Sequence, residues 1–167
     1  ILKNLWHRGA TGAEENTGDG AGILLQIPDK FLRAECGKLG IDLPTAGEYA
    51  AGNIFLPNNL SDREDCISKL SRIVKEEGQF VLGWREIPLG PEVIGPSARK
   101  AQPHFSQIFL GKGADTKIGS EFERKLYVIR KRIEHLIWAS KLKEKSLFYI
   151  PSLSSMTIVY KGMLLAN

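Results

Sequence analysis

Glycine and polar residues crowd the first part of this 167-residue chain. A His7-Arg8-Gly9 tripeptide precedes a glycine-rich run that ends at Gly22, and the apolar segment 23–28 follows at once. Such a density of glycine is typical of a loop that adopts positive φ angles or lets another group come close. A phosphate-binding loop needs a Gly-Lys-Ser or Gly-Lys-Thr triplet leading into a helix, and a dinucleotide fingerprint must also open a helix. Here no lysine follows the glycines, so a nucleotide site is disfavoured. A purely structural role of this loop is the alternative interpretation.

Thiols and imidazoles are the other side chains that could do chemistry. Cys36 and Cys66 lie far apart without Cys-x-x-Cys spacing, so neither a disulfide framework nor a zinc or iron-sulfur site is predicted. Cys66 falls on the apolar stripe of a predicted helix, which favours a small core residue over a nucleophile. His104 and His135 have no acidic or thiol partner at metal-ligand spacing. We therefore expect structural roles for all four and no metal site.

Composition fits one globular domain over residues 1–167, with 43% hydrophobic and 25% charged residues. The net charge of +4 arises from 23 basic and 19 acidic residues that are interleaved along the chain, so it indicates little about partners. No apolar stretch approaches the roughly 20 residues that a membrane helix needs. These observations argue against a membrane protein, and the mild excess of basic residues does not by itself indicate nucleic-acid binding, which also needs a clustered basic face.

The elements around the loop follow from the apolar pattern. The segment 23–28 predicts a buried strand that holds the loop on its downstream side. Pro28 is expected as the first residue of a short helix through Glu35, with Phe31 and Leu32 turned toward the core.

Further strands are predicted at residues 49–56, 80–87, 105–110, 147–150 and 156–160. Gly52, inside the first of these, indicates a bulge or a close approach of another backbone or side chain. Residues 88–104 contain four prolines and are expected to form an ordered crossing loop.

Two amphipathic helices are predicted from capping boxes and apolar stripes. Ser61 and Glu64 would cap a helix through Glu77, and Ser120 and Glu123 would cap the second. The first stripe consists of Cys66, Ile67, Leu70, Ile73 and Val74, and the second of Phe122, Leu126, Ile129, Ile133, Leu136 and Ile137. The second helix also has a basic face made by Arg124, Lys125, Arg130, Lys131 and Arg132. Such a face is usually solvated, although contact with nucleic acid or with a membrane is an alternative.

Strands and helices are mixed without strict alternation, which favours an α+β fold over a doubly wound parallel sheet. Residues 1–6 have the pattern of the last turns of a helix, and the stretch from Gly162 onward has that of a helix start. We therefore expect an excerpt of a larger domain, interrupted at both ends.

Several runs, in order along the chain, resemble the amidotransferase domain of the glutamate synthase large subunit. They are residues 4–10 (NLWHRGA), 18–28 (GDGAGILLQIP), 52–57 (GNIFLP), 81–88 (VLGWREIP), 122–132 (FERKLYVIRKR) and 152–164 (SLSSMTIVYKGML). The His-Arg-Gly element is shared more widely among class II glutamine amidotransferases, whereas the Gly-Trp-Arg-Glu and Tyr-Lys-Gly-Met runs are typical of glutamate synthase. The resemblance covers essentially the whole chain.

This resemblance implies a four-layer αββα sandwich of the N-terminal nucleophile hydrolase type, here incomplete at both ends. In the family, a cysteine at the start of the mature chain attacks the glutamine side-chain amide, with its own α-amino group as the base. Arg8 and Gly9 match the element that positions this cysteine and are the accessory catalytic residues that the resemblance assigns. The substrate-binding residues stay unknown. Because the nucleophile and the oxyanion residues would lie outside the excerpt, the chain alone is expected to be inactive, and neither Cys36 nor Cys66 can substitute.

Arg8 can also be interpreted as one member of a structural ion pair, and His7 as a packed histidine without a role in proton transfer. Asp19 would cap amides of its own loop or order the wall of the pocket.

The resemblance also implies the cofactors and partners of a parent enzyme. That enzyme would hydrolyse glutamine to glutamate and ammonia, add the ammonia to 2-oxoglutarate in synthase domains of the same chain, and use FMN and an iron-sulfur cluster there. It would draw electrons from ferredoxin or a nicotinamide-dependent small subunit, in the cytoplasm or in the plastid stroma. No cofactor is expected in this segment, and neither nucleic acid nor membrane is expected as a partner. A noncatalytic interaction module derived from the amidotransferase fold is the alternative.

Overall fold

The computed structural model describes residues 20–90, 92 and 94–162. The chain divides into two compact units. One contains residues 24–87 and 103–158, and the other includes the described parts of residues 20–23, 88–102 and 159–162. Within the described residues, no helix is long and apolar enough to cross a membrane.

A four-stranded antiparallel sheet is the centre of the larger unit. Its strands are β2 (Tyr49–Leu56), β3 (Phe80–Glu86), β4 (His104–Gly111) and β5 (Tyr149–Ser154), in the spatial order β3-β4-β2-β5. The central strands β2 and β4 pair along their whole length, from Tyr49 opposite Gly111 to Leu56 opposite His104. The strand predicted at residues 49–56 is confirmed with its bounds.

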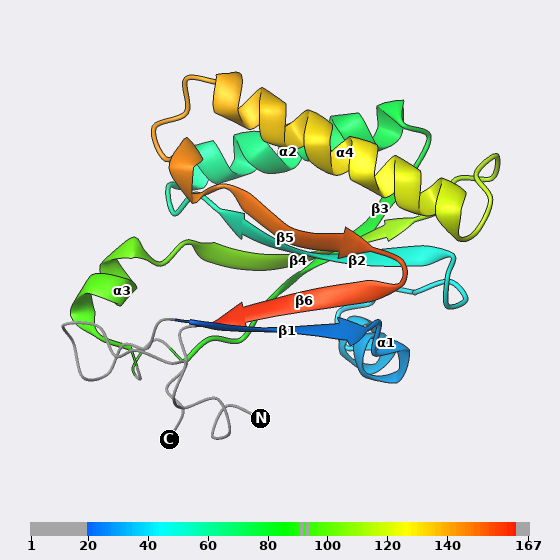
Figure 1. Ribbon diagram of the computed structural model, residues 1–167, viewed down its shortest axis with the longest axis horizontal. Helices are drawn as coiled ribbons and strands as arrows, with labels where there is room; N and C mark the ends of the chain where they lie inside the picture. Colours follow the sequence, from blue (N-terminus) through cyan, green and yellow to red (C-terminus); the bar gives the residue numbers. More distant parts are fainter. Residues whose placement is uncertain (1–19, 91, 93, 163–167) are drawn as a thin grey trace. The chain divides into compact units, whose positions relative to one another are not determined.

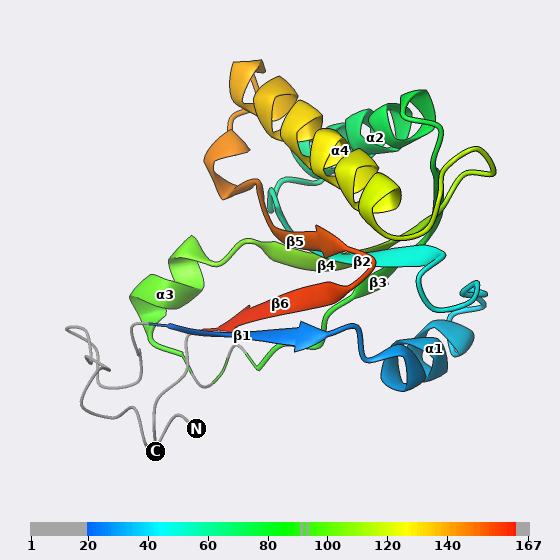
Figure 2. The same ribbon diagram turned by 45° about the vertical axis from the view of Figure 1, so that its right-hand side comes forward.

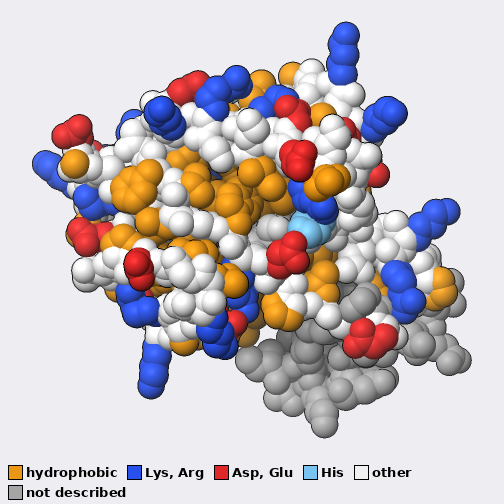
Figure 3. All heavy atoms as spheres, turned by 180° about the vertical axis from the view of Figure 1, so that it is seen from behind, with side chains coloured by type: hydrophobic (Ala, Val, Ile, Leu, Met, Phe, Trp, Pro, Cys, Tyr) orange, Lys and Arg blue, Asp and Glu red, His pale blue; other side chains and the backbone are white. Residues whose placement is uncertain are grey.

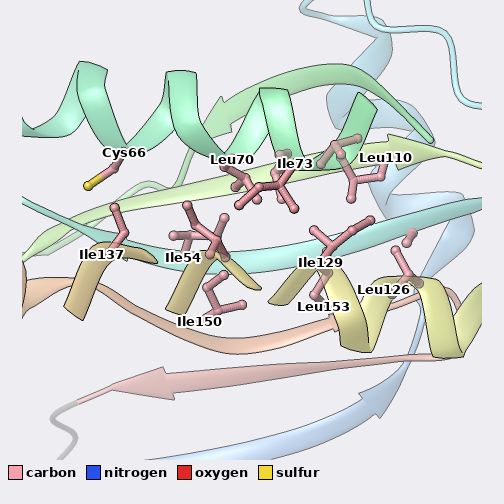
Figure 4. Packing of buried hydrophobic residues seen from close by; sticks show 14 of the residues in the cluster. Ile54, Cys66, Leu70, Ile73, Leu110, Leu126, Ile129, Ile137, Ile150 and Leu153 are labelled. Atoms are coloured by element: carbon pink, nitrogen blue, oxygen red, sulfur yellow. The ribbon is translucent and has the colours of Figure 1, made fainter. Parts of the chain in front are cut away.

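Two long helices, α2 (Leu60–Glu76) and α4 (Ser120–Ala139), lie side by side on one face of this sheet (Figure 1). Their apolar stripes are buried as predicted, except that Ile67 and Leu136 are only partly buried. Figure 4 shows side chains of both helices pointing toward Ile54, Leu110 and Ile150 on the strands. The hydrophobic core of the unit therefore lies between the helix layer and the sheet.

A shorter helix, α1 (Asp29–Gly37), lies on the opposite face of the sheet from α2 and α4 (Figure 2). Leu32 and Cys36 are fully buried, whereas Phe31 is 49% exposed. The prediction that Phe31 faces the core is therefore wrong. Leu32 and Cys36, four residues apart, share the packed side of α1, and Phe31 lies one helical step of about 100° away from Leu32.

Strands β1 (Ala21–Gln26) and β6 (Thr157–Gly162) form a separate two-stranded sheet. A strand is confirmed in the apolar segment 23–28, but its predicted burial is wrong, because Ile23 is 45% and Leu24 66% exposed. A short apolar run indicates a strand, whereas burial depends on what covers that strand, and the local pattern does not encode this.

Four further expectations about local structure are corrected. Residues Pro96–Ala101 of the predicted loop form a short helix, α3, which is consistent with the proline at its first position. The side chain of Asn59, rather than that of Ser61, caps α2 by accepting a hydrogen bond from the Asp62 amide at 3.0 Å. Helix α4 has Gly119 at its N-cap and no side-chain cap there.

The fourth correction concerns the end of the chain, where β5 runs through residues 151–154, which were expected to lie between strands. A single-turn 3₁₀ helix, η3 (Lys145–Leu147), precedes β5. Gly162 ends β6 and so does not begin a helix, and the helical ends expected at residues 1–6 and 163–167 lie outside the described residues.

The edge strand β3 lies at the back of the sheet in the orientation of Figure 1. Seen from behind, hydrophobic side chains gather across the middle of the molecule (Figure 3). Phe80 at the start of β3 is 48% exposed, and its ring covers Gly111 of the neighbouring strand so closely that a Cβ there would overlap the ring.

The mixture of helices and antiparallel strands confirms the α+β class.

Candidate functional site

The predicted site residues Arg8 and Gly9 lie outside the described residues, as do His7 and Asp19. The described structure begins at the downstream end of the glycine-rich run. Gly20 has a φ of +93°, the left-handed region that glycine adopts without strain, and strand β1 starts at the next residue. The prediction of a loop with positive φ leading into a strand is therefore confirmed at this end of the run.

The two cysteines are free and fully buried. Burial raises the pKa of the Cys36 thiol to about 11, although the nearby Arg85 and Arg33 oppose this shift. Burial likewise raises the pKa of Cys66 to about 12, and Asp65 raises it further. Both thiols are thus protonated at neutral pH, and the predicted core role of Cys66 is confirmed.

The histidines of the described residues show no arrangement for catalysis. His104 Nε2 lies 3.7 Å from Glu86 Oε1, but burial and the charge of Arg63 lower the pKa of His104, so the imidazole is largely neutral at pH 7. His135 lies on an exposed position of α4. Within the described residues, no group of three or more His, Cys, Asp or Glu side chains could hold a metal ion.

A row of polar residues crosses all four strands on the face of the sheet that α1 covers. Arg85 of β3 is opposite Gln107 of β4, Gln107 is opposite Asn53 of β2, and Asn53 is opposite Ser152 of β5. All four residues are buried, and Gln107 is completely inaccessible. We call these four residues the polar row.

Hydrogen bonds join Asn53, Gln107 and Arg85 of the polar row and extend it to helix α1. Gln107 Nε2 donates to Asn53 Oδ1 at 2.9 Å, and Arg85 Nη1 lies 3.5 Å from Gln107 Oε1. Arg85 Nη2 donates to Glu35 Oε2 of α1 at 2.9 Å, and the Arg85 guanidinium lies 5.8 Å from the centre of the Phe31 ring. No buried side-chain nitrogen or oxygen atom of the described residues lacks a hydrogen-bond partner.

The start of α1 is fixed to the same face of the sheet by a second set of contacts. The Tyr49 hydroxyl donates to Asp29 Oδ1 at 2.9 Å, and Arg33 Nη2 donates to the same oxygen at 2.9 Å. Arg33 also donates to the carbonyl oxygens of Leu43 and Pro44. The hydrogen bonds from Arg33 and Tyr49 lower the pKa of Asp29, whereas burial raises the pKa of Tyr49. Helix α1 is therefore held at both of its ends.

Sequence reasoning missed the polar row, although a signal was present. Strands β2 and β4 each contain an amide side chain inside a largely apolar run, as in Ala51-Gly52-Asn53-Ile54-Phe55 and Gln107-Ile108-Phe109. A buried polar residue needs a hydrogen-bond partner, so each of these positions implies another. Without the strand order, however, the sequence does not say which polar residues face one another.

The described arrangement is a framework rather than a reaction centre. Its thiols are protonated and inaccessible, and its carboxylates Asp29 and Glu35 are engaged by cations. What it does is hold α1 on the sheet, and strand β1, which continues from the glycine-rich run, lies directly before α1 in the sequence.

Comparison with known proteins identifies the class to which this chain belongs. The family of class II glutamine amidotransferases matches residues 1–167, the whole chain. The chain belongs to this family.

The curated relatives are more specific, because they are glutamate synthases. The glutamate synthase (NADPH) large chain of Bacillus subtilis is 44% identical over 164 residues, which cover 98% of this chain and 10% of the relative. The glutamate synthase (NADH) of Schizosaccharomyces pombe is 38% identical over 169 residues, covering 98% and 8%. Ferredoxin-dependent glutamate synthase 2, chloroplastic, of Arabidopsis thaliana is 36% identical over 162 residues, covering 95% and 10%. The chain spans about a tenth of the length of these relatives.

Proposed function

We propose that this chain is part of the glutaminase domain of a glutamate synthase large chain. The observation that supports this most directly is that 98% of the chain aligns with glutamate synthases at 38–44% identity, within a family that matches the whole chain. The parent enzyme would release ammonia from glutamine and add it to 2-oxoglutarate.

The chemistry proposed for the intact domain is acyl transfer to a cysteine thiolate. The sulfur of a terminal cysteine attacks the side-chain amide carbon of glutamine, the carbon-nitrogen bond breaks, and the nitrogen leaves as ammonia with a proton from the α-ammonium group. Water then hydrolyses the thioester to glutamate and the free thiol. Arg8 and Gly9 would position the thiolate, since a guanidinium offers fixed hydrogen-bond donors and favours the negative charge.

We further propose that residues 1–167 form part of one class II amidotransferase domain with four layers in the order αββα. The helix layer of α2 and α4 on a four-stranded sheet supports one helix layer and one sheet of this arrangement. The two-stranded sheet of β1 and β6 would contribute to the other sheet.

The proposed parent uses FMN and an iron-sulfur cluster in other domains. Ferredoxin or a nicotinamide-dependent small subunit would supply the electrons, because the names of relatives include both NADPH or NADH and ferredoxin forms. Cytoplasm or plastid stroma is the proposed location, the latter because plant relatives are named chloroplastic.

The test uses the full-length protein that contains this chain, purified from its source. Glutamate formation from 2-oxoglutarate is measured with glutamine labelled at the amide nitrogen and, separately, with ammonium. The wild type is expected to transfer the label. Arg8→Ala is expected to lower the glutamine-dependent rate about 100-fold, the size of effect seen when one preorganised donor is lost, and to leave the ammonium-dependent rate unchanged.

Arg124→Ala is the matched control, because Arg124 is an exposed arginine of α4 and lies outside the proposed site. Its two rates should equal those of the wild type. A wild-type protein that transfers no label from glutamine would refute the proposed function and favour a noncatalytic module.

A further inference from the structure

We infer that Arg85 is a positioning residue of the glutaminase, which acts through Glu35 by holding helix α1 in place. This inference rests on the proposed function. It assigns a role to the Gly83-Trp84-Arg85-Glu86 run, one of the two runs that distinguish the resemblance to glutamate synthase.

The first step of the argument is the burial of the Arg85 charge. The side chain of Arg85 is only 9% exposed, and its guanidinium forms an ion pair with Glu35 at 2.9 Å. A charge removed from water in this way needs an ionic partner and further hydrogen bonds. Moving Glu35 away from Arg85 would therefore leave a buried charge without its partner, which costs free energy. Because Glu35 belongs to α1, this cost opposes a displacement of the helix.

The second step is the contrast between the two cations that Glu35 binds. Lys38 Nζ lies 2.5 Å from Glu35 Oε1, but the Lys38 side chain is 69% exposed, and Lys38 directly follows the last residue of α1. This second pair is local and solvated, so it cannot fix α1 to anything else. Of the two ion pairs of Glu35, the one with Arg85 is the pair that links α1 to the sheet, at a sequence separation of 50 residues.

The third step concerns Gly83 and Trp84, the two residues before Arg85 in the run, whose contacts agree with the packing of α1 on this face of the sheet. A Cβ at Gly83 would lie 2.6 Å from Ile41 Cδ1, so glycine at this position lets the segment after α1 pack against β3. Trp84 points the other way and packs against the hydrophobic core under α2 and α4. The run thus anchors β3 in the core on one side and receives α1 on the other.

The fourth step connects α1 to the strand that leaves the glycine-rich run. Only Ile27 and Pro28 separate β1 from α1. The Ile27 amide donates to the Met156 carbonyl at 2.9 Å, the Asp29 amide to the Ile27 carbonyl at 2.9 Å, and the Leu32 amide to the Pro28 carbonyl at 3.0 Å. Because this connection is only two residues long and hydrogen-bonded, a displacement of α1 would also displace β1. Strand β1 in turn is continuous in sequence with the run that begins at Arg8.

The experiment uses the full-length protein with Arg85→Met, which keeps an unbranched side chain and removes the guanidinium with its charge. The glutamine-dependent kcat is expected to fall about 10- to 100-fold, because a displacement of about 1 Å in a catalytic group has effects of this size. The ammonium-dependent rate and the KM for glutamine should be unchanged. Hydrogen exchange should become faster for the α1 amides and stay the same for the α4 amides.

Lys38→Met is the matched control, since it removes the exposed cation from the same carboxylate, and its rates should stay within twofold of the wild type. Glu35→Gln is the second variant, which retains an acceptor for Arg85 and should lower the glutamine-dependent kcat to a smaller degree than Arg85→Met. This variant tests the inference if Arg85→Met fails to fold.

Two outcomes would overturn the inference. One is a ratio of glutamine-dependent to ammonium-dependent rates that stays within twofold of the wild type in both Arg85→Met and Glu35→Gln. The other is an equal loss of both rates with faster exchange in α4, which would show general destabilisation instead of positioning. Failure of the proposed function would look different, because the wild type itself would then lack the glutamine-dependent rate.

Discussion

The two faces of the four-stranded sheet are built on different principles, although the same strands supply both. On the face toward α2 and α4, Ile54, Leu110 and Ile150 meet the apolar stripes of the helices. On the face toward α1, the polar row lies across the strands, and hydrogen bonds link Asn53, Gln107 and Arg85 of this row and end in the ion pair with Glu35. Asn53 and Ile54 are adjacent in β2 and point to opposite faces.

This difference indicates what each face specifies. Apolar packing is not directional, so the helical face depends mainly on filled volume. A buried hydrogen-bonded row depends on each group meeting its partner, and an unmatched group is costly. We therefore expect the helical face to determine most of the stability, and the polar row to determine strand register and the placement of α1.

The largest effect is expected at Ile54, where truncation breaks the helical face. Ile54→Ala should lower the free energy of opening of β2 by about 2–5 kcal/mol, because it removes buried methyl groups and leaves a cavity. Ile54→Val is the matched control and should cost about 0.5–1.5 kcal/mol. Native-state hydrogen exchange of β2 in the full-length protein measures both. A loss at Ile54→Ala no greater than that at Ile54→Val would contradict the importance of volume on this face.

An intermediate effect is expected at the adjacent Asn53, where a substitution sharpens the comparison. Asn53→Leu keeps the approximate size of the side chain but leaves Gln107 Nε2 without the Asn53 acceptor, at a cost of about 1–3 kcal/mol. Combining it with Gln107→Met should cost at least about 0.5 kcal/mol less than the sum of the two single changes, since residues in one hydrogen-bonded network couple. Hydrogen exchange of β2 and β4 gives the double-mutant cycle. Strictly additive costs would show that the polar row does not act as a unit.

The smallest effect is expected at the outer layer, where Glu77 connects the end of α2 to Arg132 and Lys125 of α4. The hydrogen bond from Arg132, followed by that from Lys125, lowers the pKa of Glu77 below its ordinary value of 4.5. A carboxyl with a lowered folded pKa contributes stability above its unfolded pKa and loses it as the pH falls through the folded value. Opening of α4 should therefore become easier as the pH falls below 4.5.

Glu77→Gln is expected to remove this part of the acid dependence and to change little at pH 7, because both cations are 40% exposed and solvent screens the pairs. Hydrogen exchange of α4 between pH 5 and pH 3 measures the difference. An unchanged pH profile in Glu77→Gln would show that these ion pairs do not stabilise the helix layer.

Local pattern was sufficient for much of the helical face. Apolar residues three or four apart, such as Leu126, Ile129 and Ile133, already mark one side of α4, and the buried stripe is confirmed. The basic side was predicted to be solvated. In the structure most of its cations are half-exposed members of ion pairs with Glu76, Glu77 and Glu134. Glu76 is the last residue of the neighbouring helix α2 and Glu77 follows it, whereas Glu134 belongs to α4 itself.

Local pattern failed where a residue's partner is distant in sequence. Glu123 was predicted to close a capping box with Ser120, but its carboxylate accepts hydrogen bonds from Ser154 and Ser155 at the end of β5. Gly52 was predicted to allow a bulge or a close approach. The structure shows both, with a register shift next to it and Leu153 Cδ1 2.7 Å from where a Cβ would lie.

The sequence by itself determined the elements and the family of this protein. Hydrophobic periodicity and glycine positions are local properties, so strand β2 and the two amphipathic helices can be predicted, and the ordered runs along the chain indicate the class II amidotransferases. The tertiary structure alone decided which buried polar groups meet. Arg85, Gln107 and Asn53 become neighbours only because the strand order is β3-β4-β2-β5, and strand order results from packing over the whole unit rather than from any local segment.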